Sequence, residues 1–332
     1  MQSNPQELAR CPDRPTAQPA FIAVGLAILA GAGCASNTAG IAPGFSGMAE
    51  VNESTYLAIN DRKTPRDSGY RFAVIDASKE EGIVISPVAL TGIDAAYYPS
   101  DLEAICAIPN SNGEFLAAES GFYKGRFGRL MHIGLSNEDS RGWQLRLINQ
   151  RELRDRPPTE EGTTPKHDEI EGLVCVRHNA QLLIAYCERG FDENSGELHW
   201  GSLDLSTLVF QAQGTHDLQS PTLTDNRDCS ELHIEDRGES TVSIVAAATF
   251  DEDDDNGPFR STVYRAGTLK LDATSGEWTF SDEDRETIYD VEGLKIEALS
   301  SGPSGKSRYA FGTDDENYGG VWRRFGTIYP EN

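Results

Sequence analysis

The stretch DVEGLKIEAL, residues 290–299, joins a glutamate, a small residue and an apolar run, and this combination recurs along the chain. It appears as DEIEGLVCV at 168–176 and as DLEAICAI at 101–108. A fourth and weaker copy is CSELHIED at 229–236. When the copies are aligned on their glutamates, the aligned residues are Glu103, Glu171, Glu231 and Glu292. The intervals are 68, 60 and 61 residues (171−103, 231−171, 292−231). A fixed period of this size indicates an internal repeat.

A fifth copy precedes the others. FSGMAEV at 45–51 has the same apolar pattern, with Ser46 at the glutamate position. Each copy is followed by further short runs rich in β-branched and aromatic residues, such as FLAAES at 115–120 and WQLRLI at 143–148. Clusters of Gly, Asn, Asp and Ser separate the runs, as expected between strands. No segment carries a helical stripe of helix length, so the sequence predicts an all-β fold.

Four strands per sixty-residue unit are typical of a β-propeller with four-stranded antiparallel blades. We expect five blades, with six as the alternative, over residues 45–326, followed by a C-terminal tail at 327–332. The fifth unit lacks a clear fourth run, and either 326–329 or the segment before Ser46 would complete it. A β-sandwich would use the same strands but would not require the repeat.

The N-terminal region has the features of an export signal. Arg10 and Arg14 precede an apolar segment at 20–33 that is too short and too rich in glycine for a spanning helix. The next residue is Cys34, and the junction resembles the lipobox of bacterial lipoproteins, although Gly31 stands where that motif usually has leucine. The resemblance implies a lipoprotein signal peptide at 1–33, lipidation of Cys34 and a linker at 34–44. We therefore expect a monomeric cell-envelope protein whose only membrane contact is its lipid anchor, at the outer membrane or the periplasmic face.

The chain is strongly acidic, with 53 Asp and Glu against 29 Lys and Arg and a net charge of −24. Such a field disfavours nucleic acid and anionic membranes as partners and favours cations. Alternatively, the charge only maintains solubility. In an oxidising compartment Cys106, Cys175, Cys187 and Cys229 allow three disulfide pairings, among which the sequence does not choose. Buried free thiols are the alternative for each of them.

In a propeller the first strand of each blade is innermost, so the aligned glutamates should converge on the axis. We expect Glu103, Glu171, Glu231 and Glu292 to surround it. Their mutual repulsion would be offset by a bound calcium ion, by hydrogen bonds to neighbouring backbone amides, or by raised pKa values.

The ends of the second strands should share one face of the disc, and they carry charges of both signs. As further metal ligands we expect Glu119, Glu188, Asp251, Asp314 and Asp315. As groups for an anionic ligand we expect Arg62, Lys63, Lys124, Arg126 and Arg189. Solvated hairpin loops would have a similar composition, which is the alternative to a site.

The repeated strand pairs DLEAICAIP…GEFLAAESG, EIEGLVCV…LLIAYCERG and VEGLKIEAL…YAFGTDDEN resemble the secreted propellers known as phytase-like, or "esterase-like activity of phytase". The resemblance implies a propeller, export and calcium binding. We expect a module that binds a cation together with a small anionic ligand or an envelope protein. The alternative is a calcium-dependent phosphoesterase, in which Glu119, Glu188, Asp314 and Asp315 would converge with Lys124, Arg126 or Arg189. The sequence contains neither G-x-S-x-G nor H-E-x-x-H.

Overall fold

The computed structural model describes residues 44–63, 69–79, 82–120, 128–138, 140–153, 169–190, 195–222, 227–236, 240–251, 255–303 and 307–326. The predicted signal peptide, Cys34, most of the linker and the C-terminal tail lie outside these residues, as do Lys124 and Arg126. Within the described part the structure is almost entirely β-sheet, with short 3₁₀ helices η1 (Ala95–Tyr97) and η4 (Glu316–Tyr318). None of its helices has the length and apolar character needed to cross a membrane.

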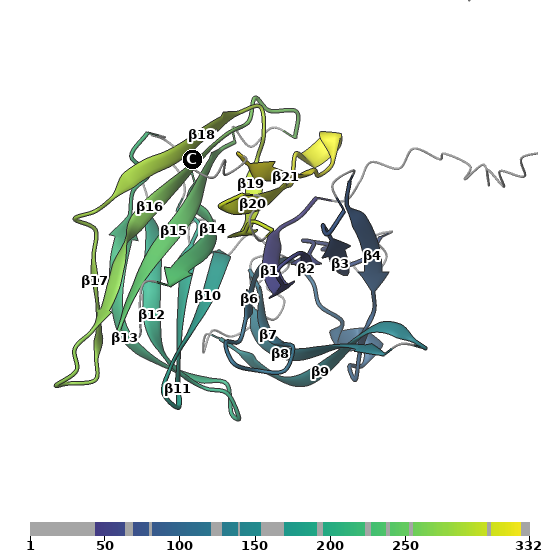
Figure 1. Ribbon diagram of the computed structural model, residues 1–332, viewed down its shortest axis with the longest axis horizontal. Helices are drawn as coiled ribbons and strands as arrows, with labels where there is room; N and C mark the ends of the chain where they lie inside the picture. The colour runs from purple at the N-terminus through teal and green to yellow at the C-terminus, as the bar shows by residue number, and fades with distance from the viewer. Residues whose placement is uncertain are drawn as a thin grey trace, which may run out of the picture. The chain divides into compact units, whose positions relative to one another are not determined.

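The strands form five sheets (Figure 1), which we number as blades one to five in chain order. Blade one contains β1 (Gly47–Asn52), β2 (Thr55–Ile59), β3 (Phe72–Asp76) and β4 (Val84–Val88). Blade two contains β6 (Leu102–Ala107), β7 (Glu114–Glu119), β8 (Arg129–Glu138) and β9 (Gly142–Glu152), with β5 (Leu90–Thr91) parallel to β9. Blade three contains β10 (Ile170–His178), β11 (Gln181–Glu188), β12 (Gly196–Asp204) and β13 (Val209–Leu218).

Like blade two with its added β5, blades four and five depart from the four-stranded pattern. Blade four contains β14 (Arg227–Asp236), β15 (Thr241–Phe250), β16 (Arg260–Leu271) and β17 (Trp278–Ser281), and β18 (Glu286–Glu292) pairs with β16 as a fifth strand. Blade five contains β19 (Ile296–Ser301), β20 (Tyr309–Thr313) and β21 (Trp322–Phe325), three strands in the described part of the chain.

The innermost strands close a ring. β1, β6, β10, β14 and β19 contact one another in this order, and β19 contacts β1. The closure is reinforced where the Phe45 amide donates to the Thr313 carbonyl at 2.9 Å. The predicted all-β propeller with five blades is therefore confirmed, and a sixth blade is not needed to complete the ring.

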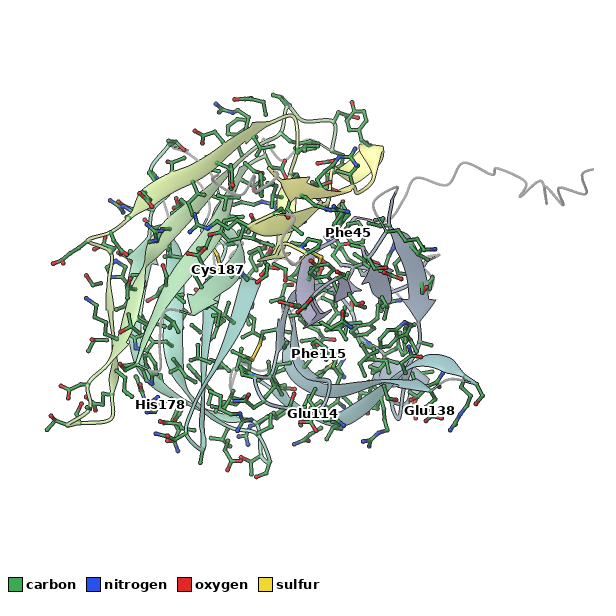
Figure 2. The ribbon with its side chains drawn as sticks, in the orientation of Figure 1. Phe45, Glu114, Phe115, Glu138, His178 and Cys187 are labelled. Carbon is green, nitrogen blue, oxygen red and sulfur yellow. A yellow bond between two sulfur atoms is a disulfide. The ribbon has the colours of Figure 1, made fainter. Side chains whose placement is uncertain are left out.

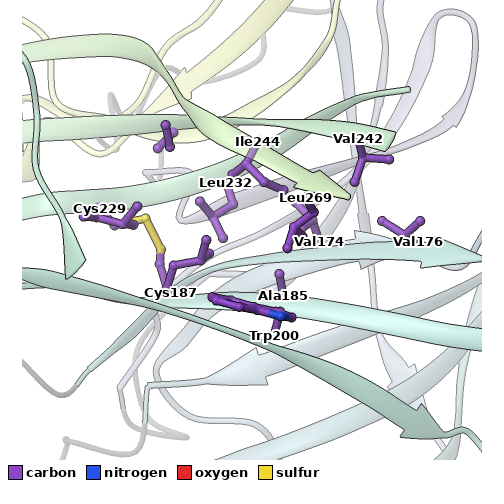
Figure 3. Packing of buried hydrophobic residues seen from close by; sticks show 14 of the residues in the cluster. Val174, Val176, Ala185, Cys187, Trp200, Cys229, Leu232, Val242, Ile244 and Leu269 are labelled. Carbon is purple, nitrogen blue, oxygen red and sulfur yellow. A yellow bond between two sulfur atoms is a disulfide. The ribbon is translucent and has the colours of Figure 1, made fainter. Parts of the chain in front are cut away.

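Apolar residues fill every junction between neighbouring blades. Among the described residues five hydrophobic clusters occur, and each joins two adjacent blades around the ring. In Figure 3 the cluster between blades three and four packs Trp200 and Val174 against Leu232 and Leu269. Burying such faces drives folding, and it makes each blade dependent on its neighbours.

Two disulfides cross these junctions. Cys106 on β6 pairs with Cys175 on β10, which links blades two and three. Cys187 on β11 pairs with Cys229 on β14, which links blades three and four. Both appear as yellow bonds in Figure 2, the second beside the label of Cys187. Of the three pairings open to the sequence, the structure contains Cys106–Cys175 together with Cys187–Cys229, and each bond joins blades that are consecutive in the ring.

Candidate functional site

Three innermost strands enter the ring with one four-residue pattern: a charged residue, an apolar residue, a glutamate and a small residue. The copies are DLEA at 101–104, EIEG at 169–172 and KIEA at 295–298. In each copy the strand register shifts at the glutamate, which marks a β-bulge. The glutamate and the charged residue two positions before it line the same space in all three copies.

The second strands supply the other wall of this space. Asp61 follows β2, Arg189 follows β11, Asp251 follows β15 and Asp314 follows β20. All four line a cavity of about 260 Å³ on the ring axis, which we call the axial cavity. Its lining consists of charged residues: Asp61, Lys63, Asp101, Glu103, Glu169, Glu171, Arg189, Arg227, Asp251, Asp255, Lys295, Glu297, Asp314 and Glu316. Of these described residues ten are acids and four are bases, so together they carry an excess of six negative charges when all are ionised.

On the side of blades four and five the charges are paired. The Arg227 guanidinium lies 3.0 Å from Asp251 and 3.0 Å from Glu297. The Lys295 ammonium lies 3.0 Å from Glu297 and 3.3 Å from Asp251, and it also contacts Glu316. Except for Glu316, whose side chain is 33% exposed, these groups are almost completely buried, and their mutual pairing offsets the cost of removing them from water.

Blade three contributes one base to the cavity. Arg189 contacts Glu169 through Nη1, and its Nε lies 3.4 Å from Glu171. The Glu169 Oε1 atom is buried and accepts no hydrogen bond within the described part of the chain. A buried carboxylate oxygen without a donor is costly and is a candidate for an additional ligand.

The side of blades one and two is dominated by acids. Oxygens of Asp61, Asp101 and Glu103 all lie within 4.8 Å of one another. The base nearest to them in the described structure is Lys63, whose Nζ lies 3.5 Å from Asp61 and 3.9 Å from Asp101. Its side chain is 48% exposed, so solvent screens these two contacts.

Burial and crowding shift the protonation of this region. Burial raises the pKa of Glu103 well above its ordinary value, and the carboxylates of Glu171, Asp101, Asp61 and Glu297 raise it further. Burial also raises the pKa of Asp61, an effect that Lys63 opposes. The acidic side of the cavity therefore holds negative charge only at a cost, which a proton or a cation relieves.

Six of the sequence-predicted residues meet in the axial cavity, namely Glu103, Glu171, Asp251, Asp314, Lys63 and Arg189. Glu231 also lies on an innermost strand, but it is fully buried and outside the cavity lining. Its Oε1 atom accepts a hydrogen bond from the Leu232 amide at 2.8 Å. This is the backbone-amide arrangement that the sequence left open as an alternative for these glutamates.

The predicted place of Glu292 on an innermost strand is wrong. Glu292 ends β18, an outer strand of blade four, and it is exposed. The glutamate of the fifth inner strand is Glu297, 66 residues after Glu231 (297−231). The E-G pair misled the alignment, because Gly293 serves a turn with φ of +79° here. The pattern apolar–Glu–small, in which IEA matches LEA and IEG, identifies the correct residue.

Four other predicted residues lie outside the axial cavity lining. Arg62, Glu188 and Asp315 are each next in sequence to a lining residue, whereas neither sequence neighbour of Glu119 belongs to the lining. Glu119 is fully buried and accepts hydrogen bonds from Arg129 at 2.9 and 2.6 Å. Asp315 accepts from the Lys295 amide and the Thr313 hydroxyl, both at 2.7 Å. Arg62 is half-buried and does not belong to the lining.

Eight described lining residues are not among the predicted site residues: Asp61, Asp101, Glu169, Arg227, Asp255, Lys295, Glu297 and Glu316. Asp101, Glu169 and Lys295 could have been found, because each stands two positions before an inner-strand glutamate. Arg227 precedes the apolar part of β14 without any motif, so its inward position depends on the three-dimensional packing.

No protein-family model matches the chain, and no curated protein matches it. The resemblance to phytase-like propellers therefore has no support from a family match. Among solved structures, the chain is similar to an exo-1,5-α-L-arabinanase from a bovine ruminal metagenomic library, with 11% identity, a TM-score of 0.45 and coverage of 86% of this chain and 94% of that one. A thermostable family-43 glycoside hydrolase gives 10% identity, a TM-score of 0.44 and coverage of 87% and 95%. A GH32 β-fructofuranosidase from Bombyx mori gives 10% identity, a TM-score of 0.39 and coverage of 85% of this chain and 59% of that one. At these identities the likeness is one of fold.

Proposed function

We propose that this protein is an exported propeller that binds a calcium ion in the axial cavity, with Asp61, Asp101 and Glu103 as ligands. The observation that carries the proposal is the convergence of these three carboxylates within 4.8 Å in a cavity with six excess acids. Glu103 has four acidic neighbours that raise its pKa. A divalent cation would neutralise this charge and release the protons that the carboxyls otherwise hold.

The donor set fits calcium. Calcium binds carboxylate oxygens at about 2.3–2.6 Å, so ligands on opposite sides of the ion lie at most about 5.2 Å apart. Three oxygens within 4.8 Å can therefore share one ion with small side-chain adjustments. Calcium takes about 6–8 oxygens, which leaves positions for water or for the oxygen of an anionic ligand. The half-exposed Lys63 lies beside these positions and would contact such a ligand.

The geometry favours cation binding over a calcium-dependent phosphoesterase. The phosphoesterase hypothesis needs bases that are available to orient a phosphate. Arg189, Arg227 and Lys295 are each engaged by two or more carboxylates of the same cavity. Of the acids expected to converge in that hypothesis, Asp314 lines the cavity, whereas Glu119, Glu188 and Asp315 do not.

The proposal includes export, with residues 1–33 as the signal peptide and Cys34 as the lipid anchor in the cell envelope. The four cysteines in the described residues all form disulfides. Disulfides persist in oxidising compartments, which supports an exported protein. Envelope compartments also contain free calcium, in keeping with an acidic site near the ring axis.

Thermal unfolding with added calcium tests the proposal. A ligand at about 100 times its Kd stabilises the folded state by about 2.7 kcal/mol, so Tm should rise by about 5 °C or more relative to a chelator-treated sample. Glu103→Gln keeps the side-chain shape, removes a ligand charge and should abolish most of the rise. Glu292→Gln removes an exposed carboxylate of β18 and should leave the rise unchanged. An equal rise in wild type and Glu103→Gln, or none in wild type, would refute calcium binding at this cluster.

A further inference from the structure

A second group of ionisable side chains lies on blade three, apart from the axial cavity lining. Glu188 ends β11, and Glu197 and His199 lie on β12. The His199 Nε2 atom is 3.3 Å from Glu188 Oε1 and 3.4 Å from Glu197 Oε2. One donor atom from each residue lies within 4.8 Å of the other two. Two carboxylates and an imidazole form a mixed nitrogen and oxygen donor set.

We propose that Glu188, Glu197 and His199 bind a zinc ion or a similar borderline-soft divalent cation. In a tetrahedral zinc site with bonds of about 2.0–2.1 Å, neighbouring donor atoms lie about 3.3–3.4 Å apart. The two nitrogen–oxygen separations in the structure have this value. Imidazole favours zinc over calcium, which takes oxygen ligands, so this site differs in chemistry from the axial cluster.

The surroundings of His199 support a ligand rather than an ordinary hydrogen bond. Its Nε2 atom is buried and has no hydrogen-bond partner among the described residues, although two carboxylates lie nearby. In a tetrahedral site the metal, not a carboxylate oxygen, lies on the axis of the nitrogen lone pair. The angular mismatch with both carboxylates is therefore expected for a metal-binding imidazole.

The imidazole is held in place before any ion binds. The ring stacks on Tyr186 of β11 with centroids 4.6 Å apart and an interplanar angle of 13°. Tyr186 in turn packs edge-on against Phe210 of β13 at 5.7 Å. A donor fixed by packing loses little conformational entropy on binding, which favours affinity.

The site has an open side. Glu188 and His199 are largely buried, but the Glu197 side chain is 38% exposed. Three protein ligands leave the fourth tetrahedral position to water or to an anionic group from solution. Such an open coordination position is the arrangement that catalytic zinc sites share, whereas structural zinc sites have four protein ligands.

Cobalt and zinc titrations of the metal-free protein test the proposal. Co²⁺ should give the visible absorption of a tetrahedral complex, and Zn²⁺ should displace it with a stoichiometry of one. Glu197→Gln, at a partly exposed position, and His199→Phe, which retains a ring for stacking on Tyr186, should each weaken Zn²⁺ binding by at least about 10–100-fold, the range seen when even an indirect partner of a ligand is lost. Glu103→Gln should leave it unchanged.

The outcomes separate this site from the proposed calcium site. Loss of Zn²⁺ binding in the two blade-three variants with retention in Glu103→Gln supports the proposal, whatever the calcium result. If the three residues form only an ion pair, wild type will give no tetrahedral Co²⁺ spectrum, and the proposal fails. It fails equally if both blade-three variants bind Zn²⁺ as tightly as wild type. Near-ultraviolet circular dichroism verifies that each variant is folded.

Discussion

Glu171 illustrates how single residues of the axial cavity respond to pH. The residue is only 3% exposed. Burial raises its pKa to about 8; Arg189 and Arg227 oppose this shift, whereas Glu169 and Glu297 add to it. In the unfolded chain the pKa is near 4.5. The folded protein therefore holds a proton on Glu171 at pH values where the unfolded chain has released it.

This difference between the two pKa values makes the folded state less stable as the pH rises. The contribution of Glu171 to stability is complete below about pH 4.5 and is lost as the pH rises through about 8. The unfolding free energy falls by up to about 1.4 kcal/mol per pH unit over this interval. We predict that the unfolding free energy of the metal-free protein, measured with urea, falls between pH 5 and pH 8. Glu171→Gln should make the slope smaller, whereas Glu292→Gln should not alter it. An identical slope in wild type and Glu171→Gln would contradict the shift.

At the scale of elements, the approach of β10 to β14 depends on Gly172. A Cβ atom added to Gly172 would lie 2.5 Å from the Leu232 amide nitrogen and 2.9 Å from the Glu231 carbonyl carbon. Both are backbone atoms of an innermost strand that the ring holds in place. The equivalent residues of β6 and β19 are Ala104 and Ala298, so blade three alone of these three has no space for a methyl group.

We predict that Gly172→Ala destabilises the protein by about 1–3 kcal/mol, the usual cost of overpacking in a core. Gly134→Ala on β8 is the matched control, because its Cβ would meet only the end of the Ile148 side chain, at 3.3 Å. Urea unfolding measures both variants. Equal stability of Gly172→Ala and wild type would show that β10 and β14 can separate at no cost.

The same elements show what the sequence predicts and where it stops. The period of the apolar runs predicts the five blades, because the same apolar pattern recurs in the inner strand of each blade. The pattern does not predict that β18 pairs with β16. Because Glu292 belongs to β18, it lies in an outer strand and not at the axis. Nor does it predict which acids meet a buried base. Arg129 engages Glu119 from the next strand, and such cross-strand pairs depend on register, which a one-residue shift reverses.

At the scale of the whole molecule, the ring holds together through its five blade junctions. Disulfides cross two of them, between blades two and three and between blades three and four. The junction of blade five with blade one relies on an apolar cluster that includes Phe45, Tyr56 and Trp322, and on hydrogen bonds such as that from Phe45 to Thr313. Because the axial cavity takes side chains from all five blades, its geometry depends on every junction.

We predict that the disulfides contribute to this closure and that their loss weakens the whole ring rather than one blade. Replacing Cys187 and Cys229 by alanine should lower the unfolding free energy by about 2–5 kcal/mol, mainly because the unfolded chain regains freedom. Calorimetry should still show a single transition at a lower temperature, since neither neighbouring blade can bury its apolar face alone. Reductant should lower the Tm of wild type and have a smaller effect on the variant, which retains the Cys106–Cys175 bond. A wild-type Tm unaffected by a reductant that opens both bonds would contradict this role.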